Sequence, residues 1–217
     1  MRCAFIFDLD GTLVNSEKQI AKSANRARNL LGIPELPSEK YFSKIGLPAS
    51  QLFDDLSGSE QQINQLVNVF REELVKDIEL GNIVYEGVSE FLSKSKHRNI
   101  LIGVATSKPT HIAKLVIQNS KIAELVDHVQ GSDEIPFKPN PAVINECIKN
   151  LNAERNIMFG DRIEDMQAAK NTPIKGIGIC QTHHKQNELQ QAGATLVYEN
   201  FEKALLDFDQ ICSELEI

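Results

Sequence analysis

The sequence predicts a doubly wound α/β fold, in which a Rossmann-like core with a parallel sheet carries an inserted all-α helical module. Short, continuously apolar runs alternate with segments of helical hydrophobic spacing through most of the chain, as is typical of a parallel sheet covered by helices on both faces. One long segment near the N-terminus has helical spacing without any such run. We therefore expect residues 1–14 and 99–217 to form the core and residues 15–98 to form the module.

The first expected strand is Cys3–Phe7, an apolar run that ends directly in the polar stretch Asp-Leu-Asp-Gly-Thr at residues 8–12. An uninterrupted apolar run of this length fits a strand that is buried on both faces. Similar runs predict further strands at residues 100–105, 156–160, 174–179 and 194–198. Apolar residues at helical spacing over 113–117 and 143–151 predict helices between these strands.

Two apolar stripes at helical spacing predict the helices of the inserted module. The first stripe comprises Ile20, Ala24, Ala27 and Leu31, and the second runs from residue 63 to residue 78. Prolines and glycines lie between the two stripes, where they interrupt regular structure. We expect several helices in this module and no strand.

Composition argues against several classes of function. The 217 residues include 30 acidic and 23 basic side chains, and the net charge of −7 disfavours a general binder of nucleic acid or anionic membranes, since such partners need clustered cations. The chain contains no apolar run long enough to span a membrane, and its N-terminal apolar run is too short for a signal peptide. The four cysteines form no Cys-x-x-Cys pair, which favours buried thiols over disulfides or a zinc site. We expect a cytoplasmic protein, and its oligomeric state stays open.

Polar residues at the ends of the expected strands are the candidates for a functional site. They are Asp8, Asp10, Thr12, Thr106, Ser107, Lys108 and Asp161. Ligands of open parallel sheets bind at the carboxyl ends of the strands, so this topology brings these distant residues to one edge. Asp8 and Asp10 repel each other unless a cation lies between them, and magnesium, which prefers oxygen ligands, suits two carboxylates. The pair His183-His184 is interpreted as part of a surface loop, because adjacent residues do not readily face one metal.

Four motifs occur in order along the chain. They are Asp-Leu-Asp-Gly-Thr at 8–12, Thr106 after an apolar run, Lys138 in Phe-Lys-Pro-Asn-Pro at 137–141, and Gly-Asp-Arg-Ile-Glu-Asp at 160–165. Together they resemble the motifs of the haloacid dehalogenase-like superfamily of phosphohydrolases. The helical insertion resembles the cap of the phosphoglycolate phosphatase and β-phosphoglucomutase branch. The resemblance covers essentially the whole chain.

This resemblance implies roles for the aspartates. Asp8 would be the nucleophile that forms an aspartyl phosphate, and Asp10 would protonate the leaving oxygen and later activate water. The carboxylates of Asp8 and Asp161 and the backbone carbonyl of Asp10 would hold Mg²⁺. Asp165 would stand behind these ligands, in contact with the metal at most through water.

The resemblance also implies which residues bind the phosphoryl group. Thr106 would donate a hydrogen bond to a phosphoryl oxygen, and Lys138 would offset the charge of Asp8 and of phosphate. Ser107 would either bind phosphate in the same way or cap the following helix. Lys108 would either reach the substrate or face water, and the second alternative is favoured. Lys138 is expected on a short loop before a helix that Asn140 caps, where a cation contributes little to stability.

The predicted function is that of a Mg²⁺-dependent phosphatase acting on a small phosphorylated metabolite, with phosphoglycolate or a sugar phosphate as substrate. One alternative is a phosphotransferase like β-phosphoglucomutase. Relatives with that activity show an arginine shortly after the glycine at position 46, whereas in this chain the first arginine after Gly46 is Arg71, which weakens this alternative. Asp10 argues against carbon–halogen hydrolysis. A phospho-accepting receiver module is an alternative of another class, but receivers are shorter and lack both Asp10 and the helical insertion.

Overall fold

The strands form one parallel sheet in the order β3-β2-β1-β4-β5-β6. The computed structural model describes residues 1–181 and 186–215, so the predicted loop position of His183-His184 lies outside the described residues. The strands are β1 (Cys3–Phe7), β2 (Ile100–Ala105), β3 (His128–Gln130), β4 (Arg155–Gly160), β5 (Lys175–Ile179) and β6 (Ala194–Tyr198). The strand order reverses beside β1, which is the Rossmann-like, doubly wound topology that the sequence predicts.

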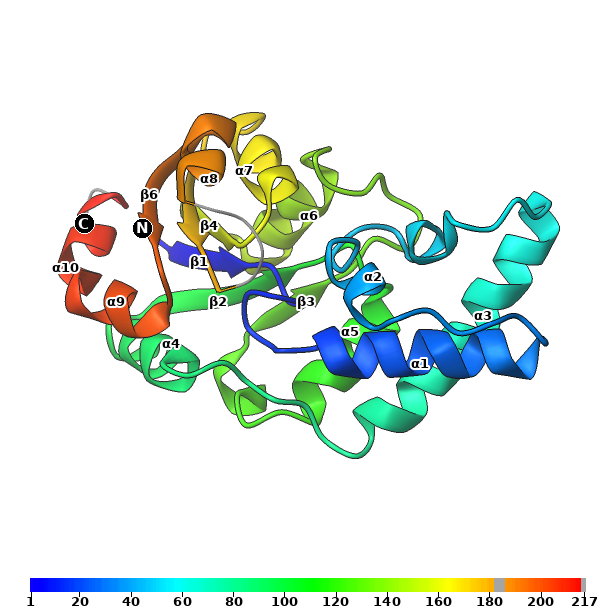
Figure 1. The fold of residues 1–217 in the computed structure, drawn as a ribbon. Coiled ribbons are helices and arrows are strands. Elements are labelled where there is room, and N and C mark those ends of the chain that lie inside the picture. Colours follow the sequence, from blue (N-terminus) through cyan, green and yellow to red (C-terminus); the bar gives the residue numbers. More distant parts are fainter. Residues whose placement is uncertain (182–185, 216–217) are drawn as a thin grey trace.

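Helices cover both faces of the sheet (Figure 1). On one face lie α4 (Val88–His97), α9 (Phe201–Leu206) and α10 (Phe208–Ser213), and on the other α6 (Ala142–Leu151), α7 (Ile163–Lys170) and α8 (Gln186–Ala192). The central strand β1 alternates between them: Phe5 and Phe7 belong to the core cluster with α4, while Ala4 and Ile6 belong to the cluster with α6. Burial on both faces explains the continuous apolar run of this strand.

Aromatic rings fill the core beneath β1. Phe5 and Phe7 are fully buried, and the Phe5 ring lies 5.0 Å from that of Phe159 and 5.9 Å from that of Phe91. Phe7 stacks on Phe159 at 4.7 Å. Such packing anchors the strand that carries Asp8 at its end, and it holds that end in place.

The strand β3 was not predicted from the sequence. It has three residues at the edge of the sheet, and only Val129 among them is buried. A strand this short offers no apolar run that sequence analysis can detect. It pairs with β2, and α5 (Thr110–Gln118) packs against it.

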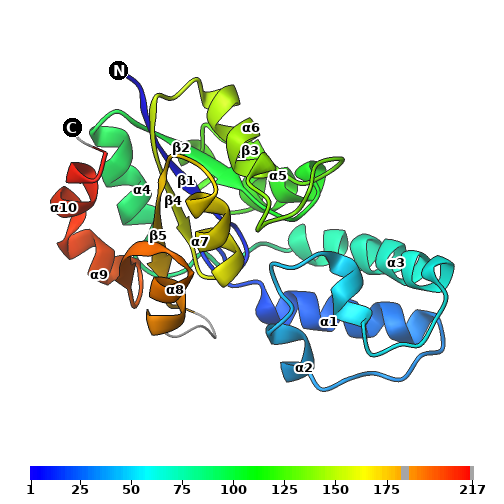
Figure 2. The ribbon, with the colours of Figure 1, turned by 90° about the horizontal axis from the view of Figure 1, so that it is seen from above.

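The inserted module contains α1 (Glu17–Leu30), α2 (Glu39–Phe42), the 3₁₀ turn η1 (Ala49–Phe53) and α3 (Glu60–Ile78). The helices α1 and α3 pack along each other beside the sheet (Figures 1 and 2). Ile20 and Ala24 on α1, and Phe70 and Leu74 on α3, are buried, as their spacing predicts. The module therefore has its own apolar contacts next to the carboxyl ends of the strands.

The helix α4 lies inside the range 15–98 but does not join the module. It packs against β2 and α9, and its Phe91 is part of the aromatic core under the sheet. We therefore propose that the insertion ends before Val88 rather than at residue 98.

Two sequence expectations concern cysteines and membranes. All four cysteines are free thiols, and Cys3, Cys147 and Cys212 are buried, which confirms the interpretation of Cys3 and Cys147 as core residues. Among residues 1–181 and 186–215, every helix is too short or too polar to cross a membrane.

Candidate active site

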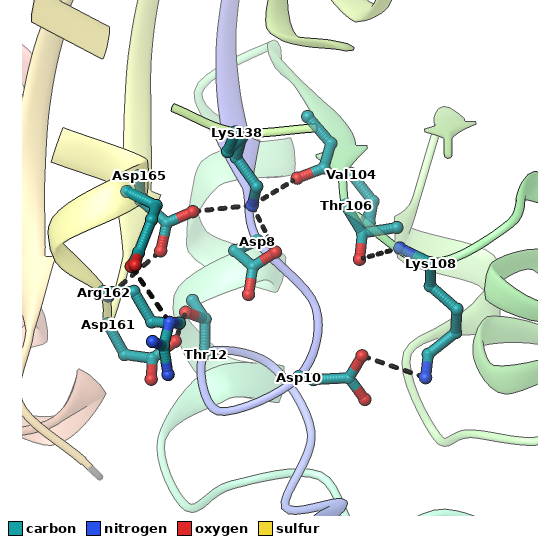
Figure 3. A network of polar contacts seen from close by, with 12 residues as sticks. Asp8, Asp10, Thr12, Val104, Thr106, Lys108, Lys138, Asp161, Arg162 and Asp165 are labelled. Atoms are coloured by element: carbon teal, nitrogen blue, oxygen red, sulfur yellow. Dashed lines mark hydrogen bonds and ion pairs between the residues drawn. The ribbon is translucent and has the colours of Figure 1, made fainter. Parts of the chain in front are cut away.

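The residues that follow the central strands meet at the edge of the sheet next to the helical module (Figures 1 and 3). Asp8 follows β1, Thr106 follows β2 and Asp161 follows β4, and Lys138 reaches them from the loop before α6. Their side chains are almost completely excluded from water. Strand topology brings these residues together, because Asp8 and Asp161, which meet here, are 153 positions apart along the chain.

Lys138 lies at the centre of a buried charge network. Its Nζ lies 2.5 Å from Oδ1 of Asp8 and 2.6 Å from Oδ1 of Asp165, and it donates a hydrogen bond of 3.1 Å to the carbonyl of Ala105. The two carboxylates raise the pKa of Lys138, although burial opposes this. Lys138 lies on the expected loop before α6, but it is buried rather than solvated. Because its ammonium joins two buried carboxylates, we expect its removal to destabilise the fold, in contrast to the sequence-based expectation.

Burial dominates the chemistry of Asp8. It raises the pKa of this carboxyl to about 8; the ammonium of Lys138 opposes the rise, and the neighbouring carboxylates of Asp165 and Asp161 add to it. The second carboxylate oxygen, Oδ2, is buried and has no hydrogen-bond partner among residues 1–181 and 186–215. One oxygen of Asp8 is thus held by Lys138, and the other is unengaged.

Three carboxylates form an all-oxygen cluster. Ligand oxygens of Asp8, Asp161 and Asp165 lie within 4.8 Å of one another, and all three residues are buried. Thr12 donates a 2.9 Å hydrogen bond from Oγ1 to Oδ1 of Asp161. At Gly11 the backbone has a φ of +90°, and a Cβ there would lie 2.6 Å from Oδ2 of Asp161, so only glycine permits this close turn. An oxygen-only donor set with an orphaned buried oxygen fits a hard divalent cation.

Asp165 differs from Asp8 because both of its carboxylate oxygens are already engaged. Oδ1 pairs with Lys138, and Oδ2 accepts a hydrogen bond of 3.0 Å from the backbone N–H of Arg162. A Cβ on Gly160 would lie 2.4 Å from the Asp165 side chain, so the chain passes very close here. These contacts suit a residue that orients Lys138 and the loop after β4.

Asp10 turns its carboxylate away from this cluster and toward Lys108 (Figure 3). The two side chains are 6% and 9% exposed, and Lys108 Nζ lies 3.0 Å from Asp10 Oδ2. The prediction that Lys108 faces water is therefore wrong. A backbone turn in which the N–H of Lys108 donates to Thr106 Oγ1, at 3.2 Å, directs the lysine inward, where the buried carboxylate attracts it.

The residues after β2 expose hydroxyl groups to the site. Thr106 is anchored by its backbone, with its N–H donating to the carbonyl of Gln130 at 3.0 Å and its carbonyl accepting from Ser132 Oγ at 3.1 Å. Ser107 Oγ is buried, and no hydrogen-bond partner for it lies in the part of the chain that the structure describes. Pro109 stands at the N-cap of α5, so the alternative in which Ser107 caps this helix is wrong.

A comparison with family models places this geometry in a known group. The model for haloacid dehalogenase-like hydrolases matches residues 5–179. The chain belongs to the haloacid dehalogenase-like hydrolases. The predicted family is confirmed, and with it the predicted enzyme class of phosphoric monoester hydrolases.

Known members of the dehalogenase-like family resemble the chain over nearly its whole length. A phosphoglycolate phosphatase from Rhodobacter capsulatus is 31% identical over 192 residues, which cover 85% of this chain and 87% of the relative. One from Colwellia psychrerythraea is 26% identical over 213 residues, covering 93% and 94%. The crystal structure of a hydrolase from Pseudomonas syringae, 26% identical, superposes with a TM-score of 0.79 over 97% of this chain and 99% of that one. A β-phosphoglucomutase from Clostridium difficile, 20% identical, shares the fold with a TM-score of 0.81 over 100% and 98%.

In this dehalogenase-like hydrolase, every predicted site residue lies buried at one edge of the sheet. These residues are Asp8, Asp10, Thr106, Ser107, Lys138, Asp161 and Asp165. Within the predicted helix start, Asn140 does serve as a cap, since its Oδ1 accepts from the backbone N–H of Ala142 at 3.0 Å, although the helix begins one residue later than expected.

Arg162 is a site residue that sequence reasoning missed. Its Nη1 donates to the carbonyls of Ser43 and Ile45 in the module, at 3.1 and 2.9 Å. A Cβ on Gly46 would lie 2.8 Å from Arg162 Cδ. Arg162 thus joins the loop of Asp161 to the module. Nothing in the sequence distinguishes it from a solvated arginine, because its acceptors are backbone carbonyls far along the chain.

Proposed function

We propose that this hydrolase is a Mg²⁺-dependent phosphatase that cleaves a small phosphomonoester metabolite through an aspartyl phosphate on Asp8. The observation that supports this most is the state of the Asp8 carboxylate. Lys138 holds one of its oxygens, and the other is buried, unengaged and next to the carboxylate of Asp161. A nucleophile needs such an oriented and unsolvated atom.

The proposed reaction has two steps. In the first, a carboxylate oxygen of Asp8 forms a bond to phosphorus while the bond from phosphorus to the ester oxygen breaks, and Asp10 gives its proton to the leaving alcohol. In the second, a water oxygen attacks the same phosphorus as Asp10 takes a proton from it. Inorganic phosphate leaves, and the Asp8 carboxylate is restored. The separate orientation of Asp10, toward Lys108 and away from Asp8, suits a group that acts on the leaving side.

Positive charge and hydroxyl groups surround the place of the phosphoryl group. Lys138 offsets the negative charge that accumulates there, and Thr106 and Ser107 supply hydroxyl donors from the loop after β2. The carboxylates of Asp8 and Asp161 and the backbone carbonyl of Asp10 would hold Mg²⁺. The metal would neutralise phosphoryl oxygens and reduce their repulsion of the Asp8 carboxylate.

Phosphoglycolate or a sugar phosphate is the proposed substrate. The names of relatives at 26% and 31% identity favour phosphoglycolate. Mutase activity is not favoured, since the likeness to a β-phosphoglucomutase is one of fold at 20% identity. A receiver module would have no use for an acid–base group at Asp10.

The test is a phosphatase screen over a panel of metabolite phosphomonoesters, with Mg²⁺, with Ca²⁺ and with excess EDTA. We expect turnover with Mg²⁺, inhibition by Ca²⁺ because its looser and higher coordination misplaces Asp8, and activity near zero in EDTA. Asp8→Asn is the matched control and should be inactive. Full turnover by thoroughly stripped protein would contradict the metal requirement, and isomerisation of a hexose phosphate without net release of phosphate would favour the mutase.

A further inference from the structure

A cavity lies between the helical module and the phosphoryl site. The core contributes Asp10, Ser107 and Lys108 to its wall, and the module contributes apolar side chains of α1, η1 and α3 together with Arg71. Asp10 is the proposed acid for the leaving group, so the part of the substrate that leaves must occupy this cavity. Whatever lines its module side therefore selects the substrate.

Arg71 is the residue of this wall whose surroundings indicate a bound ligand. Its Nε is buried without a hydrogen-bond partner, and no ion pair of Arg71 occurs within the described part of the chain. The other two cations of the cavity are satisfied, since Lys108 pairs with Asp10 and Lys44 with Asp54. A buried donor of a charged group without an acceptor is costly, and an apolar wall such as Ile20 or Leu74 cannot supply one.

We propose that Arg71 binds a second anionic group of the substrate, a carboxylate or a second phosphate, at the end remote from the scissile phosphoryl group. This inference rests on the proposed phosphatase function and specifies its substrate class. A guanidinium presents a planar fork of donors that matches the two oxygens of a carboxylate or phosphate, whereas a neutral hydroxyl leaves most of that fork unpaired. Arg71 thus selects phosphomonoesters that carry a second anionic group over sugar phosphates that carry none.

The experiment compares substrates that differ in the remote group. 2-Phosphoglycolate carries a carboxylate, 2-hydroxyethyl phosphate replaces it with a neutral hydroxyl at nearly the same size, and glucose 1,6-bisphosphate and glucose 6-phosphate form the corresponding pair for a second phosphate. We expect the wild-type kcat/KM to be higher, in at least one pair, for the member whose remote group is anionic. Arg71→Met should lower that preference roughly tenfold to a hundredfold by acting on the anionic member alone, and Arg71→Lys should retain part of it.

Two further measurements separate this inference from the proposed function. Lys76→Met removes a charge from the exposed side of the same helix and should leave both members of each pair unchanged. In Asp8→Asn protein, which binds without turnover, calorimetry should show that Arg71→Met weakens binding of 2-phosphoglycolate and not that of 2-hydroxyethyl phosphate.

The outcomes are distinct. Equal preference in wild type and Arg71→Met, with both enzymes active, would overturn the role of Arg71 and leave the phosphatase standing. Hydrolysis only of phosphomonoesters whose remote group is uncharged would overturn the proposed substrate class and leave the phosphatase function standing. If the protein hydrolysed no phosphomonoester but Arg71→Met still weakened its binding of phosphoglycolate, the proposed function would be overturned and the binding site at Arg71 would be supported.

Discussion

At the scale of single residues, the site depends on charges that are buried in pairs. Lys138 joins Asp8 to Asp165, and Lys108 holds Asp10. Each ammonium fixes the direction in which one carboxylate presents its remaining oxygen. The two aspartates of the first motif, identical in chemistry, thereby acquire different orientations.

Removing the ammonium of Lys138 should damage both catalysis and stability. We expect Lys138→Ala to lower kcat by about two orders of magnitude or more, because a charge partner of the transition state is lost. It should also lower the free energy of unfolding by about 3 kcal/mol, because Asp8 and Asp165 then face each other unpaired. Urea denaturation and steady-state kinetics measure the two effects. Lys149→Ala, an exposed lysine in an i,i+3 pair with Glu146, is the control and should change neither quantity.

Because Asp8 and Asp10 have different proposed roles, we expect substitutions of the two residues to block different steps of the reaction. Asp8→Asn should form no phosphoenzyme. Asp10→Asn should lose activity on alkyl phosphates, whose leaving oxygen needs a proton, by about 10²–10⁴-fold, and should lose less on activated aryl phosphates. Intact mass spectrometry after acid quenching of an aryl phosphate reaction should show one added phosphoryl group on Asp10→Asn. Equal aryl-to-alkyl rate ratios in wild type and Asp10→Asn would contradict the assignment of Asp10.

At the scale of elements, the loop after β4 contributes to the carboxylate cluster of Asp8, Asp161 and Asp165 and also contacts the module. It presents Asp161 to Asp8, and through Arg162 it binds the carbonyls of Ser43 and Ile45 in the module. The module is therefore held by hydrogen bonds to the loop that carries Asp161, a proposed metal ligand.

Arg162→Ala should loosen this connection. We expect kcat/KM for the metabolite substrate to fall about tenfold, because two hydrogen bonds from a charged donor are lost, while the phosphoenzyme still forms. Amide hydrogen exchange should accelerate in residues 43–47. Glu164→Gln is the matched control, since Glu164 pairs with Nε of Arg162 and its loss leaves both Nη1 bonds in place. Unchanged exchange in Arg162→Ala would show that the module is held by other contacts.

At the scale of the whole molecule, burial of the Asp8 carboxyl links folding to pH. Burial raises the pKa of Asp8 from its usual 3.8 to about 8, so the folded protein keeps a proton that the unfolded chain releases. The stabilising contribution of this proton is complete below the unfolded pKa and is lost as the pH rises toward the folded one. Ionising Asp8 without a cation therefore destabilises the fold.

This linkage predicts how metal and pH act together. We expect the Tm of metal-free protein to fall between about pH 5 and about pH 8, and Mg²⁺ to raise Tm more at the higher pH, where it binds the ionised carboxylate. Differential scanning fluorimetry with and without Mg²⁺ measures both trends. Asp8→Asn should flatten the pH dependence of the metal-free protein. A Tm that rises with pH in that interval would show that other groups outweigh Asp8.

The sequence by itself predicted every described strand except β3, the long helices of the insertion and most candidate residues of the site. Buried parallel strands need continuous apolar runs, and catalytic groups at their ends stand directly after those runs, so Asp8, Thr106 and Asp161 could be found without coordinates. The location in the cell and the absence of nucleic-acid partners stay predictions.

Only the tertiary structure decided which partners these side chains have. Lys108 and Lys138 both looked like loop cations, and only the folded chain shows that each is buried against a carboxylate. The same holds for Arg162, whose acceptors are backbone carbonyls, and for Arg71, whose buried Nε has no hydrogen-bond partner among the described residues. Local patterns encode which face of an element is buried. Pairing between residues more than a hundred positions apart depends on strand order and loop paths, which no local pattern specifies.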